Sequence, residues 1–227
     1  MRIRRALPDD VPQIVEFTRS TFPWGDYIPN VISQWINEGT TYVIEDGGRV
    51  LGILNAVPLP TGVLWLEGIR IRPEYRRRGL GRTLTEYAME QGRRIGMRYA
   101  MLMVAQWNEP SHNLVRTLGF KPVLTLWAGV AKPTNPRKAE PREYPELIQQ
   151  ALRITNGYLC IGWRCTRATP EYALSTVREI YVGPGIALDQ FTAGPPTTNK
   201  EQEILSTQPG QYTREHGTYI LYEKELT

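Results

Sequence analysis

The sequence lacks the residues and runs that mark several common protein classes. Among 227 residues it has two cysteines and two histidines, and their spacing matches no metal site. It has no apolar run near the roughly eighteen residues that a membrane helix needs. Its basic start, Met1 to Arg5, lacks the layout of a signal peptide. We therefore expect no metal, no membrane segment and a location in the cytoplasm.

The two cysteines are not expected to form a disulfide. Cys160 and Cys165 stand five positions apart within residues 158–165, which we interpret as a single strand. Side chains separated by an odd number of positions on a strand point to opposite faces of the sheet. We therefore predict that both cysteines are buried, reduced thiols.

Positive charge is in modest excess and is unevenly placed. The net charge is +4, and the arginines concentrate in residues 70–98 rather than along an extended stripe. A basic stripe is the usual footprint of a nucleic-acid surface. We therefore expect no nucleic-acid partner, whereas a local basic cluster is compatible with a phosphate-bearing ligand.

One basic segment lies where a strand should meet a helix. Residues 63–71 have strand character, residues 82–95 have apolar residues at helical spacing, and Arg76-Arg77-Arg78-Gly79-Leu80-Gly81-Arg82 connects them. Glycines at 79 and 81 let the backbone turn tightly and bring N–H groups together at a helix start, which favours an anion. The segment predicts a pyrophosphate cradle, and a solvated arginine-rich turn is the alternative.

The spacing of this segment excludes two phosphate loops and matches a third. A dinucleotide fingerprint needs a third glycine and a later acidic residue, and a P-loop needs Gly-Lys-Ser/Thr, but Gly79-Leu80-Gly81 has neither. With Arg76 in the first position, it resembles the Arg/Gln-x-x-Gly-x-Gly/Ala loop of the GNAT family of N-acetyltransferases. Residues 66–75 resemble the family's fourth strand and its Pro-x-x-Arg approach to the loop. Asn108 stands eleven residues before Gly119-Phe120, as in the family.

This resemblance covers residues 1 to about 130 and implies a fold and an acyl donor. The family has an α+β fold of the α/β sandwich type. A mixed, mostly antiparallel sheet with splayed fourth and fifth strands is flanked by helices, and the co-substrate is acetyl-CoA. The resemblance places this ligand on the fourth strand, on the loop and on an asparagine that could also be a helix N-cap. The implied residues are Ile69, Arg70, Ile71, Arg76, Arg77, Arg78, Gly79, Leu80, Gly81, Arg82 and Asn108.

Glu67 is the candidate catalytic base. Acyl transfer to an amine needs a proton acceptor and stabilisation of an oxyanion. Glu67 lies on the same strand just before the implied acetyl-CoA contacts, among apolar residues where an idle carboxylate is costly to bury. We expect a backbone N–H of Ile69 or Ile71 to bind the oxyanion. An outward-facing surface glutamate is the alternative interpretation.

The sequence departs from the family at the general acid. Many members place a tyrosine seven residues after the asparagine, and this sequence has Val115 there. Ser111 and His112 are nearby candidates, although we expect His112 to be a surface or packing residue. Otherwise the thiolate leaves unassisted, which a thiol with a pKa of about 8.5 permits near neutral pH.

The loop after the first helix is expected to select the acceptor. Trp24, Asp26 and Tyr27 place aromatic faces beside a carboxylate, a combination suited to an ammonium group, with packing into the core as the alternative. Residues 26–35 and 66–73 resemble the subgroup that contains the histidine N-acetyltransferase of vertebrates. This implies a small-molecule amine, such as an amino acid, as acceptor. The alternatives are protein N-termini or lysines, and a non-catalytic sensor or binding module.

The composition changes after residue 130, which we take as the end of an acetyl-CoA-binding domain. Four prolines among charged residues in 131–146 indicate an extended linker. Residues 147–227 are predicted to form a small α+β domain that covers the substrate site or forms the surface of a homodimer. Its expected elements are a helix at 145–153, strands at 158–164, 179–182 and 218–223, and a helix at 199–205.

Overall fold

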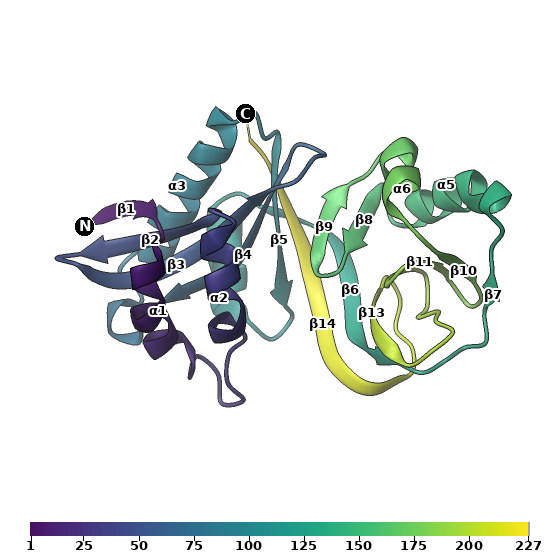
Figure 1. The fold of residues 1–227 in the computed structure, drawn as a ribbon, viewed down its shortest axis with the longest axis horizontal. Helices are drawn as coiled ribbons and strands as arrows, with labels where there is room; N and C mark the ends of the chain where they lie inside the picture. Colours follow the sequence, from purple (N-terminus) through teal and green to yellow (C-terminus); the bar gives the residue numbers. More distant parts are fainter. Residues whose placement is uncertain (227) are drawn as a thin grey trace. The chain divides into compact units, whose positions relative to one another are not determined.

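The computed structural model describes residues 1–226, which divide into two compact units (Figure 1). The first unit contains residues 1–100, 116–119 and 225–226, and the second contains residues 101–115 and 120–224. No helix within residues 1–226 is long and apolar enough to cross a membrane.

The first unit is built on four antiparallel strands in chain order. They are β1 (Arg2–Arg5), β2 (Thr41–Asp46), β3 (Arg49–Pro58) and β4 (Val63–Ile71). The turn between β2 and β3 consists of Gly47 and Gly48, at φ +55° and +80°, which is the backbone conformation that a two-residue hairpin turn requires. The sequence Asp46-Gly47-Gly48 is typical of such a turn, because glycine tolerates these backbone angles.

Three helices cover the two faces of these strands. They are α1 (Val11–Thr18), α2 (Ile28–Asn37) and α3 (Leu80–Arg94). The apolar sides of α1 and α2 share a buried core with β2 and β3, which includes Ile14, Trp35 and Ile53. On the opposite face, the Tyr42 ring on β2 lies 5.5 Å from the Tyr87 ring on α3. Helix α3 comes so close to β4 that a Cβ at Gly92 would lie 2.7 Å from Leu64.

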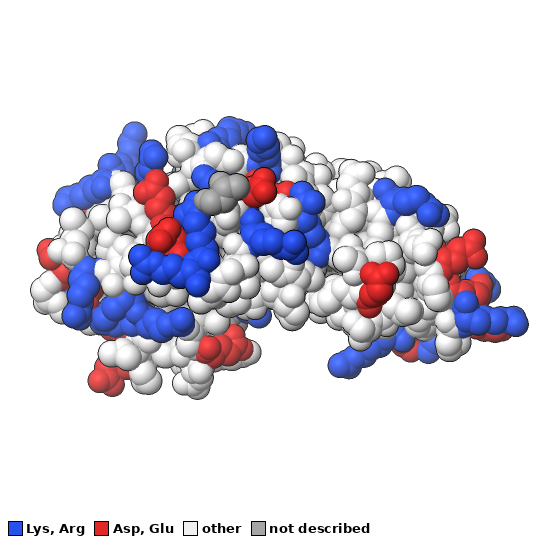
Figure 2. All heavy atoms as spheres, turned by 90° about the horizontal axis from the view of Figure 1, so that it is seen from above, with Lys and Arg blue, Asp and Glu red and all other residues white. Residues whose placement is uncertain are grey.

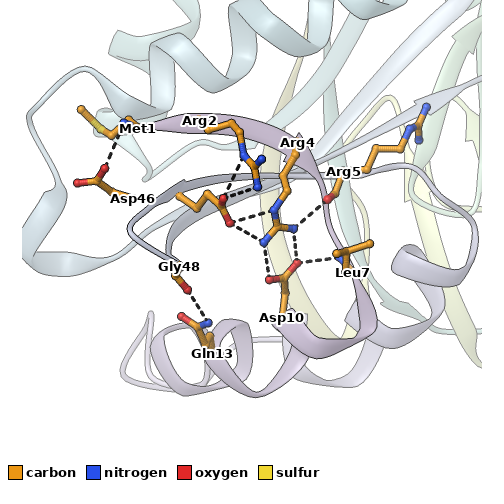
Figure 3. A network of polar contacts seen from close by, with 10 residues as sticks. Met1, Arg2, Arg4, Arg5, Leu7, Asp10, Gln13, Asp46 and Gly48 are labelled. Carbon is orange, nitrogen blue, oxygen red and sulfur yellow. Dashed lines mark hydrogen bonds and ion pairs between the residues drawn. The ribbon is translucent and has the colours of Figure 1, made fainter.

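An ionic network fastens β1 to the rest of the first unit (Figure 3). The Arg4 guanidinium donates to both oxygens of Asp10, at 2.7 and 2.9 Å, and to Glu45 on β2 at 2.6 and 2.9 Å. Arg2 donates to the other Glu45 oxygen at 2.8 Å. Asp10 and Glu45 are buried, so these pairs satisfy carboxylates that would otherwise be costly to remove from water.

The second unit combines one long sheet with three helices and a separate hairpin. Its sheet has the order β5-β14-β6-β13-β12-β11-β10-β7. The strands of that sheet are β5 (Tyr99–Ala105), β6 (Lys121–Ala131), β7 (Arg137–Lys138), β10 (Ile180–Val182), β11 (Ile186–Leu188), β12 (Phe191–Ala193), β13 (Gln202–Ser206) and β14 (Tyr212–Glu225). The remaining elements are α4 (Glu109–Thr117), α5 (Tyr144–Ile154), α6 (Pro170–Thr176), β8 (Tyr158–Ile161) and β9 (Arg164–Arg167).

The final strand, β14, pairs with β6, which lies far from it in the sequence. β14 pairs antiparallel with β6 from Tyr212 opposite Ala131 to Glu223 opposite Lys121, and in the sheet it lies between β5 and β6. The predicted linker, residues 131–146, lies within the second unit and carries β7 there. The division into domains 1–130 and 147–227 remains a prediction.

Three expectations for this region were wrong: the helix at 199–205, the single strand at 158–165 and the reduced state of the two cysteines. Residues 199–205 do not form a helix, because Gln202–Ser206 is the strand β13, which pairs with β6. Residues 158–165 are not a single strand but a hairpin that turns at Gly162-Trp163 and sets Cys160 directly opposite Cys165. The two cysteines form a disulfide, since opposite residues of a hairpin share a face of the sheet.

The fold class predicted from the sequence is confirmed. The sheets are mostly antiparallel, one parallel pair between β12 and β13 makes them mixed, and helices flank the strands of the first unit. The chain therefore belongs to the α+β class.

Candidate active site

A bulge in β4 shapes the predicted site. Ile53 pairs with Arg70 and Asn55 with Glu67, so Leu54 alone lies opposite both Gly68 and Ile69. Gly68 has φ +69°, and a Cβ there would lie 2.6 Å from the Trp35 ring. A bulge with glycine in the left-handed region adds one residue to a strand and resets the alternation of its side chains. Glycine is therefore required at this position.

The bulge decides which residues of β4 share a face. Cross-strand partners lie on the same side of a sheet, so Glu67 and Arg70 both face the α1 and α2 side, where Ile53 is buried in the core. Ile71 faces the α3 side, beside Gly52 and Ile44. In a strand without the bulge, Glu67 and Ile71 would share one face and Arg70 would lie on the other.

The Glu67 carboxylate is held by two neutral donors. Asn55 donates its amide N–H to Oε1 at 2.9 Å, and Trp65 donates its indole N–H to Oε2 at 2.9 Å. Asn55 and Trp65 are buried, whereas Glu67 is partly exposed. The carboxylate thus has a fixed direction at a place that solvent can reach, as a proton acceptor requires.

Asp26 does not present a carboxylate to an acceptor amine. Arg70 donates Nε to Oδ2 at 2.6 Å and Nη2 to Oδ1 at 3.1 Å, and the backbone N–H of Ile28 also donates to Oδ1. The Asp26 side chain is fully buried. The expectation that Asp26 attracts an ammonium group is corrected on this point, because a nearby guanidinium already compensates its charge.

The aromatic residues of the same loop differ in their surroundings. The Arg70 guanidinium carbon lies 5.1 Å from the centre of the Phe22 ring and 5.6 Å from that of Tyr27, both within cation–π range. Trp24 stacks on Phe22 with ring centres 5.3 Å apart and remains 71% exposed. The loop therefore offers exposed aromatic surface at Trp24 and Tyr27, and the Arg70 side chain packs against the Phe22 and Tyr27 rings.

The predicted phosphate loop has the backbone of an anion cradle. Arg77 and Gly79 are left-handed, at φ +60° and +79°, and Gly79 is the N-cap of α3. The first N–H groups of a helix have no partners within the helix, and the helix dipole adds positive potential there. The structure places residues 76–82 together in this turn, as the sequence predicted.

The arginine side chains of this loop contact different partners. Arg76 donates Nε to the Ile71 carbonyl at 3.1 Å, which fastens the loop to the end of β4. Arg78 lies over the Tyr75 ring at 5.1 Å, and Arg82 pairs with Glu86 one turn along α3 at 2.9 Å. Figure 2 shows Lys and Arg side chains in several groups on one face, with acidic side chains among them.

The residues near the expected general acid belong to the second unit. Asn108 accepts the Ser111 backbone N–H at 3.3 Å and so caps α4, while its predicted contact with acetyl-CoA stays a prediction. His112 is buried, with Nε2 3.2 Å from the Gln106 carbonyl and Nδ1 2.9 Å from the Tyr222 hydroxyl. A carbonyl only accepts, so Nε2 donates to Gln106, and in a neutral imidazole Nδ1 accepts from Tyr222. Val115 is buried.

Comparison with known proteins relates residues 11–120 to a family. Residues 11–120 match the model of the acetyltransferase (GNAT) family. The chain carries a GNAT acetyltransferase domain. The matched segment contains Glu67, the bulge at Gly68 and the whole of residues 76–82. Residues 11–120 are thus those of an acyltransferase domain, for which the family implies acetyl-CoA as the acyl donor.

One curated protein is similar to this chain in sequence, and one solved structure is similar to it in fold. The peptidyl-lysine N-acetyltransferase YiaC of Escherichia coli K12 is 27% identical over 135 residues, which make up 55% of this chain and 86% of that protein. A putative acetyltransferase from Thermoplasma acidophilum superposes with a TM-score of 0.59 at 20% identity, over 99% of this chain and 100% of that one. These comparisons do not confirm the resemblance to the histidine N-acetyltransferase subgroup.

Sequence reasoning missed two residues of the GNAT domain's site, Asn55 and Trp65. Asn55 interrupts the apolar run from Val50 to Val57, and a polar residue in such a run signals a buried hydrogen-bonding role. Trp65 stands two positions before Glu67, so both lie on one face of β4.

Proposed function

We propose that the GNAT domain transfers the acetyl group of acetyl-CoA to a primary amine, with Glu67 as the proton acceptor. The observation that carries the proposal is the Glu67 carboxylate, held by Asn55 and Trp65 on β4 next to the bulge at Gly68. The amine nitrogen attacks the thioester carbon, its proton passes to Glu67 directly or through water, and the C–S bond then breaks. The oxyanion formed in between is stabilised by a backbone N–H of Ile69 or Ile71.

The same proposal assigns the donor site. The diphosphate is bound by the backbone N–H groups of residues 77–82 at the start of α3, with charge from the flanking arginines. The backbone of residues 69–71 binds the pantetheine arm as an added strand would. Arg70 contributes only its main chain, because its side chain is committed to Asp26 and to the Ile69 carbonyl. Asn108 is proposed as a further contact.

The leaving thiolate departs without a side-chain acid at the family's usual position. Val115 has no proton to give, and both ring nitrogens of His112 are engaged in hydrogen bonds inside the protein. A thiol with a pKa of about 8.5 is a good enough leaving group for expulsion as the anion near neutral pH.

A peptide amine is the acceptor that the observations favour over a small molecule. Buried pairing with Arg70 withdraws Asp26 from binding a small ammonium group. Trp24 and Tyr27 instead offer exposed aromatic surface along which a lysine side chain or a peptide can lie. The relative YiaC acts on peptidyl-lysine, as its name states.

The test is an acceptor panel with thiol release as the readout. Acetyl-CoA is supplied with a lysine peptide blocked at its α-amine, a peptide with a free α-amine and acetylated lysines, free amino acids, and polyamines. We expect turnover on a peptide and its loss in Glu67→Gln, with calorimetry showing unchanged binding of coenzyme A. Turnover on amino acids or polyamines alone would reject the peptide acceptor. Binding without turnover on any amine would favour the sensor module.

A further inference from the structure

The hydrogen bonds of Asn55 can be assigned in direction. Its Oδ1 accepts the hydroxyl hydrogens of Thr40 at 2.8 Å and Thr41 at 3.1 Å, and its Nδ2 lies 2.9 Å from Glu67. With the amide turned over, Oδ1 would face a carboxylate oxygen and Nδ2 would face the two hydroxyl groups. Because an ionised carboxylate only accepts, Nδ2 faces Glu67, and Oδ1 is left to accept from the two threonine hydroxyls.

Packing alone does not account for a polar residue at this position. Asn55 is fully buried in a strand whose neighbours Leu54, Ala56 and Val57 are apolar. Replacing a buried polar group and its partners by apolar groups of similar shape is often neutral or stabilising. A chain selected for stability alone has no need of an amide here, nor of two threonine hydroxyls behind it.

Trp65 completes a clamp on the two carboxylate oxygens. Its indole N–H meets Oε2, while Asn55 meets Oε1, so each oxygen has its own donor. Both donors are neutral, in contrast to Asp26, whose carboxylate is compensated by the Arg70 guanidinium on the same face of β4. A neutral N–H donor orients a carboxylate without itself adding an opposite charge.

We propose that Asn55 and Trp65 are positioning residues that hold Glu67 in the orientation in which it accepts the amine proton, with Thr40 and Thr41 fixing Asn55. This inference rests on the proposed function of Glu67. It adds that the efficiency of acetyl transfer depends on residues that touch neither acetyl-CoA nor the amine.

The experiment compares Trp65→Phe and Asn55→Asp with Glu67→Gln and wild type. Trp65→Phe removes one N–H and keeps an aromatic ring, and Asn55→Asp replaces the donor by an oxygen that only accepts. Asn37→Asp is the matched control, since it makes the same amide-to-carboxylate change at an exposed position of α2. The assay measures kcat and the KM for acetyl-CoA with the lysine peptide. Hydrolysis of acetyl-CoA serves as the turnover measurement if the peptide is not acetylated.

We expect kcat to fall about tenfold in Trp65→Phe, as for the loss of one hydrogen bond to a charged group, and further in Asn55→Asp. The KM for acetyl-CoA and the melting temperature of Trp65→Phe should stay close to those of Asn37→Asp. A spectroscopic signature accompanies this result. The indole proton resonance of Trp65 in the ligand-free protein should move upfield in Glu67→Gln, because a neutral amide is a weaker acceptor than a carboxylate.

Three results would overturn the inference, and they separate it from the proposed function. Unchanged kcat in Trp65→Phe and Asn55→Asp, with Glu67→Gln inactive, rejects the positioning role and leaves the base in place. Parallel loss of kcat, coenzyme A affinity and melting temperature identifies a purely structural role. A wild-type kcat in Glu67→Gln rejects Glu67 as the proton acceptor and, with it, the positioning role of Asn55 and Trp65.

Discussion

Arg70 binds Asp26 through two hydrogen bonds, from Nε at 2.6 Å and from Nη2 at 3.1 Å, so a residue of β4 holds the loop between α1 and α2. The Arg70 side chain is 14% exposed and that of Asp26 is fully buried. Because both charges are largely removed from water, the loop depends on their remaining paired. A loop predicted to select the acceptor is thereby coupled to the strand that carries Glu67.

Asp26→Asn should destabilise the first unit by roughly 3 kcal/mol, since it leaves a buried guanidinium without its counter-charge. The same change should raise the KM for the acceptor, because Trp24 and Tyr27 lose their anchor. Urea unfolding and steady-state kinetics measure the two effects. The control is Glu74→Gln, which breaks an Arg49 pair of 2.7 Å between half-exposed side chains and should lose less than about 1 kcal/mol. Equal losses in the two variants would contradict the coupling.

Gly79→Ala should weaken the binding of coenzyme A. Gly79 caps α3 at φ +79°, and a side chain there strains the turn by about 1 kcal/mol and shifts the N–H groups that face the diphosphate. Gly96→Ala is a matched control, since Gly96 has φ +82° and equally open surroundings. Calorimetry should show lost affinity in Gly79→Ala alone, with similar melting temperatures for the two variants. Retained affinity would remove the loop from the site.

Gly68→Ala should be more damaging than alanine at another left-handed glycine. The new Cβ would lie 2.6 Å from the buried Trp35 ring, and φ +69° is strained for any other residue. Gly62→Ala is the control. Gly62 has φ +79° and its new Cβ would meet only the flexible Arg98 side chain, so this variant has the backbone strain without the clash with a buried ring. The difference in unfolding free energy should be roughly 1–3 kcal/mol, the usual range for overpacking a core. Equal destabilisation would show that β4 tolerates the loss of its bulge.

The protein should lose stability in acid through the network around Arg4. Burial alone would raise the pKa of Asp10, but hydrogen bonds from Arg4 and from the Leu7 backbone outweigh it and leave this pKa lowered. A hydrogen bond from Arg4 likewise lowers the pKa of Glu45. The stability from a lowered pKa is present above the unfolded value, about 4, and disappears as pH falls through the folded value.

Unfolding measured between pH 2 and 7 should therefore show a loss of stability below about pH 4. Arg4→Met should be less stable than wild type above that range and should lose less on acidification. Arg142→Met, which removes an exposed pair with Glu140, should follow the wild-type curve. If Arg4→Met lost as much stability on acidification as wild type, the acid sensitivity would not come from the network around Arg4.

Reduction should weaken the β8–β9 hairpin. The disulfide between Cys160 and Cys165 closes a short loop, for which the chain-entropy relation gives about 2 kcal/mol. Dithiothreitol should lower the melting temperature of wild type and leave that of the double variant Cys160→Ala, Cys165→Ala unchanged. Alkylation before and after reduction reports the thiols by mass. Alkylation of both cysteines without reductant would contradict the disulfide and support the reduced thiols expected from the sequence.

Features encoded by short segments could be predicted from the sequence. Asp46-Gly47-Gly48 specifies the hairpin between β2 and β3 because only a few residues tolerate its backbone angles. Residues 76–82 form the turn into α3 for the same reason, and together with residues 66–75 and with Asn108 before Gly119-Phe120 they resemble the GNAT family. In each case the information is local, so a window of a few residues contains it.

Features that depend on partners far along the chain were decided only by the tertiary structure. Residues 202–206 form a strand because β6 provides a ladder for them, and Cys160 meets Cys165 because the chain reverses at Gly162. The bulge at Gly68 brings Glu67 and Arg70 to one face because Leu54 pairs against two residues instead of one. From sequence alone, the side chains of β4 are expected to alternate between the two faces without a break. The bulge that breaks this alternation depends on the pairing with β3 and on the Trp35 ring packed against Gly68.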